Sequence, residues 1–173
     1  MKRGKRMKKL NANEWNENVF EAIGKRWMLI TAKDPESGKY NTMTASWGGM
    51  GILWNKPVCF LFIRPQRYTF EFTERTSCIS LSFFPEEYRA DLRTLGTLSG
   101  RDGDKLQKTS LSAVDNGDYV SFAEADVVIH ATKLYRSDIA PEGFVDLSLL
   151  SNYPQNDFHR MYICEINEIL INN

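Results

Sequence analysis

The chain has 173 residues, of which 42% are hydrophobic and 12% are aromatic. This size and composition predict one globular domain that buries roughly two thirds of its unfolded surface. No stretch approaches the roughly 20 apolar residues of a membrane-spanning helix, and no apolar signal segment follows the basic N-terminus, so we expect a cytoplasmic protein.

The formal net charge of zero conceals an uneven distribution. Residues 1–9 hold six basic side chains and no acidic one, which leaves 16 basic against 22 acidic groups, a net charge of −6, on the rest of the chain. We expect residues 1–12 to form a disordered, basic N-terminal arm and residues 13–173 to form a single domain. Such an arm can contact nucleic acid or anionic lipid. The acidic body argues against a nucleic-acid groove on the domain itself.

Hydrophobic alternation and turn residues divide the chain into strands and short helices. The predicted elements, in chain order, are a helix at 13–24 with Trp15, Val19, Phe20 and Ile23 on its apolar side, strands at 27–32, 41–47 and 57–63, a helical segment at 64–74, a strand at 76–84, a helix at 85–100, and strands at 125–136 and 159–171. The intervening segments are a turn at 34–40, a glycine-loosened backbone at 48–51, a charged loop at 99–108, an Asn-Gly hairpin within 114–119 and a helical or irregular excursion at 141–150. Because hairpin-type turns join most of these strands, we predict a mainly β protein with short α-helices, in which an antiparallel sheet closes into a barrel.

The three cysteines, Cys59, Cys78 and Cys164, are far apart and each lies in an apolar strand segment. They are typical of buried small hydrophobic residues in a reducing compartment. Zinc sites use paired short spacings, which are missing here. We therefore expect neither a disulfide nor a metal.

The segment NTMTASW at 41–47 places Thr42, Thr44 and Ser46 on one face of a strand and Met43, Ala45 and Trp47 on the other. Threonine is common on solvent-exposed sheet faces, so one interpretation is an ordinary exposed face. The other interpretation is a polar ligand laid along the strand.

The strand at 57–63 runs into Arg64, Arg67 and Thr69, where a helix is predicted to begin. Free backbone N–H groups and the helix dipole favour an anion at such a position, and guanidinium groups can grip a phosphate. The alternative is a surface helix with two solvated arginines.

The sequence lacks the known phosphate-binding loops and the usual nucleophile motifs. It holds two histidines, and His130 lies inside a strand pattern while His159 opens the last strand, where it can reach a ligand. If the protein is an enzyme, a cofactor should carry the reaction.

Four segments, WMLITA at 27–32, NTMTASW at 41–47, RPQRYT at 64–69 and SGRDGDK at 99–105, together resemble the flavin reductase-like, FMN-binding split-barrel family, in particular its flavoredoxin-type members. The resemblance runs from about Trp15 to Ile169. It implies a six-stranded split barrel that forms a homodimer, with FMN near the dimer interface.

The resemblance also implies a cofactor site in three parts. The strand at 41–47 would follow the isoalloxazine and ribityl groups, the segment at 64–69 would meet the phosphate, and the loop at 100–105 would approach the flavin, with Lys105 at its pyrimidine edge. His159 would face the ligand. The implied cofactor-binding residues are Asn41, Thr42, Met43, Thr44, Ala45, Ser46, Trp47, Arg64, Arg67, Tyr68, Thr69, Gly100, Arg101, Asp102, Lys105 and His159.

Two functions follow from the resemblance. The first is an FMN-dependent oxidoreductase that takes a hydride from NADH or NADPH and passes electrons to a small-molecule or protein acceptor, such as free flavin, a ferric complex or a redox protein. The second is an FMN-containing electron carrier without direct NAD(P)H activity. A barrel that binds nucleic acid through the basic arm is a third reading, which the acidic body disfavours.

Overall fold

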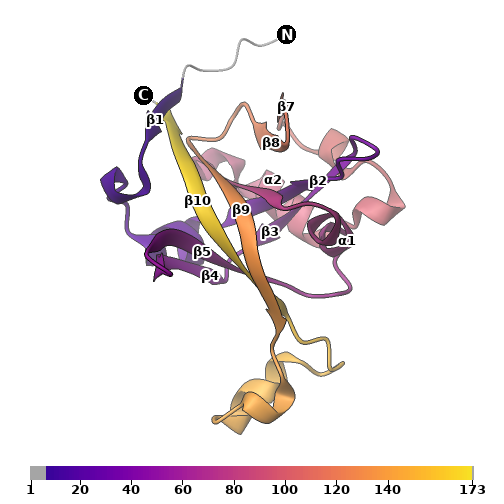
Figure 1. Cartoon of the computed structure of the whole chain (residues 1–173). Helices are drawn as coiled ribbons and strands as arrows, with labels where there is room; N and C mark the ends of the chain where they lie inside the picture. The colour runs from indigo at the N-terminus through magenta and orange to yellow at the C-terminus, as the bar shows by residue number, and fades with distance from the viewer. Residues whose placement is uncertain (1–6, 173) are drawn as a thin grey trace.

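An antiparallel sheet of eight strands organises the protein in the computed structural model, which describes residues 7–172 (Figure 1). Seven strands follow the order β3-β2-β6-β9-β10-β5-β4, β1 pairs with β10, and β7 and β8 form a separate hairpin. The strands are β1 Met7–Leu10, β2 Met28–Lys33, β3 Tyr40–Ala45, β4 Gly48–Leu53, β5 Lys56–Ile63, β6 Cys78–Phe83, β7 Ala113–Asn116, β8 Tyr119–Phe122, β9 Val127–Asp138 and β10 Arg160–Asn172.

Two α-helices and several single turns complete the architecture. The helices are α1 Tyr68–Arg75 and α2 Arg89–Thr97, a π-helix at Glu21–Arg26, and 3-10 turns at Ala12–Glu14, Glu86–Tyr88, Gly100–Asp102, Lys105–Lys108, Pro141–Gly143 and Leu147–Asn152. The mainly β, antiparallel class predicted from the sequence is confirmed. The predicted count of six strands is too low, because β1 and β4 join the sheet and β7–β8 is added beside it.

Strand β4 occupies the segment that we expected only to loosen the backbone. Gly48 has a φ of +156°, and a Cβ on this residue would lie 2.9 Å from the carbonyl oxygen of Phe60. Glycine therefore lets β4 approach β5 closely enough for a full ladder, from Gly48 opposite Leu61 to Leu53 opposite Lys56.

Residues 7–10 differ from the disordered arm expected over residues 1–12. They form β1, which pairs with β10 from Met7 opposite Asn172 to Leu10 opposite Ile169. Lys9 also forms an ion pair of 2.8 Å with Glu168 of β10. The basic residues Lys2, Arg3, Lys5 and Arg6 lie outside the described residues.

The helix predicted at 13–24 is broken. The side-chain oxygen of Asn18 accepts from the backbone N–H groups of Phe20 and Glu21 at 3.0 and 3.3 Å, so the helical turns start after Asn18. Phe20 then lies 88% exposed instead of facing the core with Ile23.

Alternating side chains of β2 point to opposite faces of the sheet and pack into two different hydrophobic cores. Ile30 packs into the barrel interior, whereas Leu29 packs under α2 against Leu92 and Leu95. All four side chains are fully or almost fully buried. This packing fixes α2 over the outer face of the sheet near β3.

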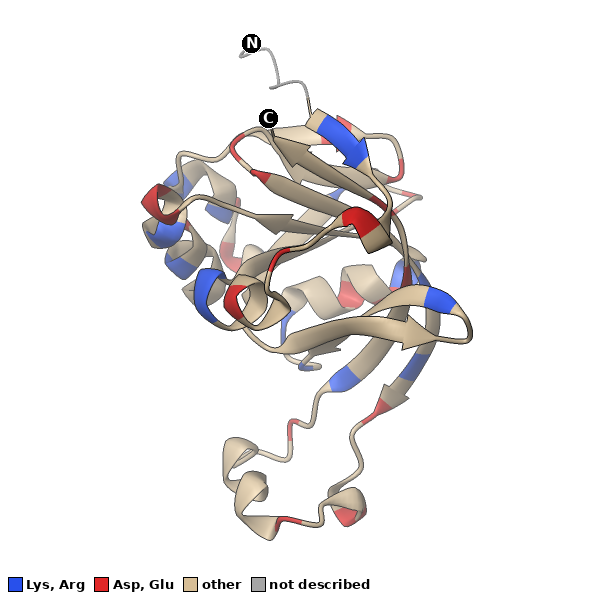
Figure 2. Ribbon diagram, turned by 90° about the vertical axis from the view of Figure 1, so that its left-hand side faces the viewer, with Lys and Arg blue, Asp and Glu red and all other residues tan. Residues whose placement is uncertain are grey.

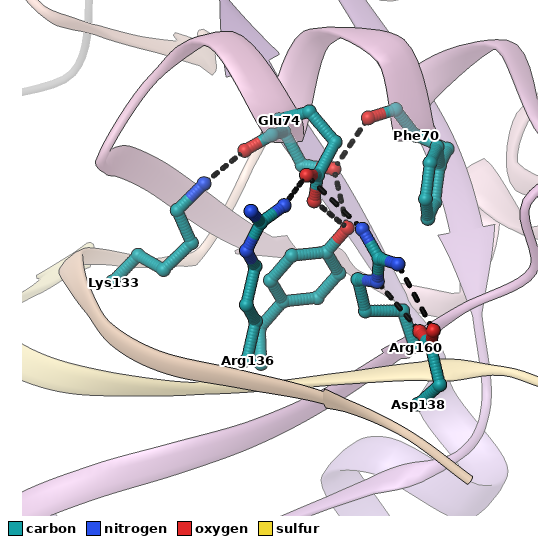
Figure 3. Close-up of polar contacts among 8 residues, drawn as sticks. Phe70, Glu74, Lys133, Arg136, Asp138 and Arg160 are labelled. Atoms are coloured by element: carbon teal, nitrogen blue, oxygen red, sulfur yellow. Dashed lines mark hydrogen bonds and ion pairs between the residues drawn. The ribbon is translucent and has the colours of Figure 1, made fainter. Parts of the chain in front are cut away.

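Helix α1 is tied to the long strands β9 and β10 by a polar network around Glu74 (Figure 3). The buried hydroxyl of Tyr162 donates to the Glu74 carboxylate at 2.7 Å, and Arg136 and Arg160 form ion pairs with the same carboxylate. Arg160 also pairs with Asp138 at 2.6 Å. The network holds the C-terminal end of α1 against β9 and β10.

The segment between β9 and β10 extends away from the sheet as the helical or irregular excursion that the sequence predicts (Figure 2). It consists of 3-10 turns and loops, and Val145 within it is 99% exposed. In residues 7–172, none of the helices is long and apolar enough to cross a membrane.

Candidate functional site

Two cations, Arg67 and Lys105, lie side by side at the C-terminal end of α2. A guanidinium nitrogen of Arg67 donates to the Gly96 carbonyl at 3.0 Å, and Nζ of Lys105 donates to the carbonyls of Leu95 and Leu98 at 2.8 and 3.2 Å. These carbonyl groups accept hydrogen bonds from some of the donors and do not neutralise the charges. Within residues 7–172, no carboxylate forms an ion pair with either side chain.

Burial is the main cause that lowers the pKa values of both cations. Burial first, and then the charge of Arg67, lowers the pKa of Lys105 to about 8 from its ordinary value of 10.5. Burial likewise lowers the pKa of Arg67. Lys105 is only 6% exposed, so an anion that entered here would meet two poorly hydrated positive charges.

The N-terminus of α1 lies at the same place. Arg67 is its N-cap residue, and no side chain caps the helix, so the N–H groups of Tyr68 and Thr69 lack intrahelical acceptors. Thr69 is 1% exposed, and its hydroxyl accepts from the amide of Asn41 on β3 at 2.7 Å. This bond joins the start of β3 to the start of α1.

Gly100 brings the loop after α2 against both elements. A Cβ on Gly100 would lie 2.3 Å from Oδ1 of Asn41 and 2.9 Å from the ring of Tyr68. Only glycine permits this close contact, which places the loop, and Lys105 with it, beside Arg67.

Two cavities of about 550 and 170 Å³ open here, and Asn41, Tyr68, Gly100 and Lys105 line both. Arg67 and Thr69 line the smaller one, and Thr42 lines the larger one. The structure therefore brings seven of the sixteen predicted site residues together around these two cavities. We call the cavities the positively charged hollow, because Lys105 lines both and Arg67 lines the smaller one.

The threonine row of β3 is already engaged by the protein. The Thr42 hydroxyl lies 2.8 Å from that of Thr31 and 3.2 Å from the Ile30 carbonyl, and the Thr44 hydroxyl donates to the Leu92 carbonyl of α2. Met43, on the other face, belongs to the barrel core. Among the described strands, β3 pairs only with β2 and is therefore an edge strand. The backbone groups on its outer edge, including those of Ala45, make no ladder hydrogen bonds and are available to a ligand.

The far end of β3 carries an aromatic cluster. The Trp47 and His159 ring centroids are 5.4 Å apart, and Nδ1 of His159 lies 2.8 Å from the hydroxyl of Tyr153. Burial, and then the charge of Arg64, lowers the pKa of His159 to about 4. His159 is therefore a neutral imidazole at physiological pH. Ser46 and Trp47 line a further cavity of about 770 Å³.

Arg64 does not join Arg67 at the helix start. It forms an ion pair of 2.5 Å with Asp157 and donates to the Asn152 carbonyl at 2.8 Å. The pair of arginines read from the sequence is thus replaced by Arg67 with Lys105. Lys105, which we expected at the pyrimidine edge of the flavin, comes from a loop distant in the chain, and no local sequence signal places it beside Arg67.

Arg101 and Asp102 lie on the outer side of the same loop. Arg101 pairs with Glu71 at 2.5 Å and lies over the ring of Tyr68 at 5.0 Å, while Asp102 is exposed. Arg101 thus connects the loop to α1 through Glu71 and Tyr68.

Comparison with known proteins shows the fold. An FMN-binding domain of a flavin reductases-like enzyme from Shewanella baltica OS155 superposes with a TM-score of 0.71 at 13% identity over 98% of this chain and 78% of that chain. A putative flavin reductase with split barrel domain from Shewanella frigidimarina gives 0.67 at 15% identity over 95% and 76%, and flavoredoxin of Desulfovibrio vulgaris gives 0.65 at 17% identity over 94% and 76%. No protein-family model and no curated protein matches the sequence. The predicted resemblance to the split-barrel fold is confirmed.

Proposed function

We propose that the protein binds FMN along β3 and acts as a flavin-dependent oxidoreductase. The observation that carries the proposal is the uncompensated cation pair, Arg67 with Lys105, beside the uncapped N-terminus of α1. A dianionic phosphate supplies the negative charge that this place lacks, and it accepts hydrogen bonds from both side chains and from the helix N–H groups.

The rest of the strand fits the rest of the cofactor. FMN has a phosphate at one end, a hydroxylated chain in the middle and an aromatic ring at the other end. Asn41 lies near the start of β3 and Trp47 lies two residues beyond its end, and the strand covers about 13 Å from Asn41 to Ala45. Between them the outer edge of β3 offers backbone groups to the ribityl hydroxyls, and Trp47 provides an aromatic wall.

Bound FMN would supply the hydride and electron chemistry. We propose that NADH or NADPH is the donor and that a small molecule or a protein is the second acceptor. The role of this chain is to hold the phosphate, orient the ring and leave one ring face accessible. Structural neighbours that are described as flavin reductases and as an NADH:FAD oxidoreductase support this reading.

The second candidate is an FMN-containing electron carrier without direct NAD(P)H activity. The flavoredoxins among the structural neighbours favour it, because the same fold and the same cofactor serve both functions.

One experiment separates the two candidates. The protein is loaded with FMN, freed of oxygen and mixed with NADH or NADPH while the visible absorption of the flavin is followed. Rapid bleaching supports the oxidoreductase. An unchanged oxidised spectrum, with normal reduction by dithionite, supports the carrier. Failure to take up any FMN contradicts both.

We also propose a homodimer in the cytoplasm. Exposed apolar side chains on β4, on the turn between β4 and β5 and on β9, among them Ile52, Trp54 and Tyr135, offer a surface for a second copy. The free thiols at Cys59 and Cys164 are compatible with a reducing compartment. Light scattering of the purified protein measures the molar mass, and a value near 19.9 kDa would contradict the dimer.

A further inference from the structure

The cavity at the end of β3 is separate from the positively charged hollow. Its volume is about 770 Å³, and it shares no lining residue with the cavities around Lys105. Ser46 and Trp47 of the β3 end form one wall, β4 forms a second, and the segment from Asn16 to Gly24 forms the third. The two sites thus lie at opposite ends of one strand.

The walls of this cavity are aromatic and aliphatic. Phe20 is 88% exposed and Trp47 is 49% exposed, and both line the cavity together with Val19, Ile23 and Met50. Leaving a phenylalanine in water forgoes the favourable free energy of burying its ring. Two exposed aromatic rings around one cavity present flat surfaces on which another ring can stack.

The cavity carries no formal charge. Among the described residues that line it, none is ionisable, and its polar groups are two asparagine amides, the Ser46 hydroxyl and glycine backbone. The charges nearest in sequence are paired, Lys25 with Glu21 at 2.6 Å and Arg26 with Glu17 at 2.8 Å. A charged ligand would lose hydration here without gaining a counter-ion.

We propose that this cavity binds an uncharged, planar ring compound, which is the class of the second substrate. The role as substrate site rests on the proposed flavin function, because Trp47 is shared by the proposed ring end of the cofactor site and by this cavity. A quinone is the acceptor of this class. Bound reduced FMN would supply two electrons and two protons, which convert the quinone to the hydroquinone and leave the flavin oxidised.

Three naphthalene probes that share one ring system and carry a neutral, an anionic or a cationic substituent test the binding assignment without redox chemistry. Saturation-transfer NMR measures 2-naphthol, 2-naphthalenesulfonate and 2-naphthylmethylammonium against the purified full chain. We expect 2-naphthol to bind at least about tenfold more tightly than either ion, which corresponds to about 1.4 kcal/mol. Equal affinity of the three probes would overturn the proposal.

A charge placed in the wall sharpens the test. Phe20→Lys removes a side chain that is 88% exposed, so the fold should tolerate it. We expect this variant to bind the sulfonate more tightly and the naphthol more weakly than the unmodified protein. Val145→Lys, at a 99% exposed position outside the cavity, is the matched control and should change neither affinity. Equal probe affinities in Phe20→Lys and the control would contradict the assignment.

FMN uptake is measured on the same proteins by visible absorption. Normal probe binding by a protein that takes up no FMN would overturn the proposed flavin function and leave the binding assignment in place. FMN uptake without selective probe binding would overturn the assignment alone.

Discussion

The side chains of Arg67 and Lys105 converge on the last turn of α2, where Arg67 donates to the Gly96 carbonyl at 3.0 Å and Lys105 donates to the Leu95 carbonyl at 2.8 Å. Helix carbonyls orient the two cations, and the negative end of the helix dipole tolerates them. Both side chains line one cavity with Tyr68 and Thr69, whose N–H groups at the start of α1 have no intrahelical acceptors. This geometry predicts several measurable properties.

Removing the Arg67 charge should weaken the binding of FMN. Hydrogen bonds to charged groups contribute about 1.5 to 3 kcal/mol, so Arg67→Gln should raise the Kd by about 10- to 100-fold. Fluorescence titration with FMN measures the effect. Arg64→Gln is the matched control, because Arg64 is committed to Asp157 and should leave the Kd within about threefold. An equal effect of the two substitutions would argue against the phosphate position.

The affinity for FMN should fall as the pH rises from 7 to 9. Lys105, whose pKa is about 8, loses its charge in the free protein across this range, and binding of the phosphate must restore the proton. The FMN phosphate stays dianionic, since its second pKa is about 6. The Kd should therefore rise by up to about tenfold. Lys105→Met should bind weakly with a flat profile, and Lys105→Arg should bind with a flat profile at all these pH values. A steep profile in Lys105→Met would mean that another group titrates.

Gly100→Ala should disturb the floor of the positively charged hollow. The added Cβ would lie 2.3 Å from Oδ1 of Asn41, so either the loop or the Asn41 side chain must move. Overpacking of this kind costs about 1 to 3 kcal/mol of unfolding free energy. Urea unfolding and FMN titration should both show a loss. Gly143→Ala, where a Cβ would meet no atom within 4 Å, serves as the control and should alter neither quantity.

His159 should make the folded state sensitive to acid. Its pKa of about 4 lies below the ordinary value of 6.5, so between these pH values the unfolded chain holds a proton that the folded chain does not. The stabilisation that depends on neutral His159 is therefore fully present above pH 6.5 and is lost as the pH falls toward 4. His159→Phe should reduce the loss of unfolding free energy between pH 7 and 4.5 by on the order of 2 kcal/mol. Denaturation curves at both pH values measure this loss. Equal losses of unfolding free energy in His159→Phe and in the unmodified protein would refute the assignment.

The sequence predicts local structure well where hydrophobic runs are uninterrupted. The strand expected at 57–63 is β5, Lys56–Ile63, and the Asn-Gly pair does form the turn of a hairpin, β7–β8. Strand β4 escapes prediction because glycine lacks strand propensity, and its pairing with β5 depends on a close contact at Gly48 that only the tertiary structure shows.

The candidate site is predictable in its residue types and less so in their arrangement. The segment 64–69 and the loop 100–105 both reach the start of β3. The sequence cannot show that Asp157 neutralises Arg64, because 93 positions separate them, or that α2 uses the hydroxyl of Thr44. Long-range packing decides which cations stay unpaired.

The most direct test of the account compares FMN with riboflavin, which has the same ring and ribityl chain and lacks the phosphate. Both are titrated into the same flavin-free protein while flavin fluorescence is recorded. We expect one FMN to bind per chain and riboflavin to bind at least about 100-fold more weakly. Loss of a phosphate that two cations hold costs about 3 kcal/mol or more of binding free energy. Equal affinities, or no uptake of FMN, would contradict the account.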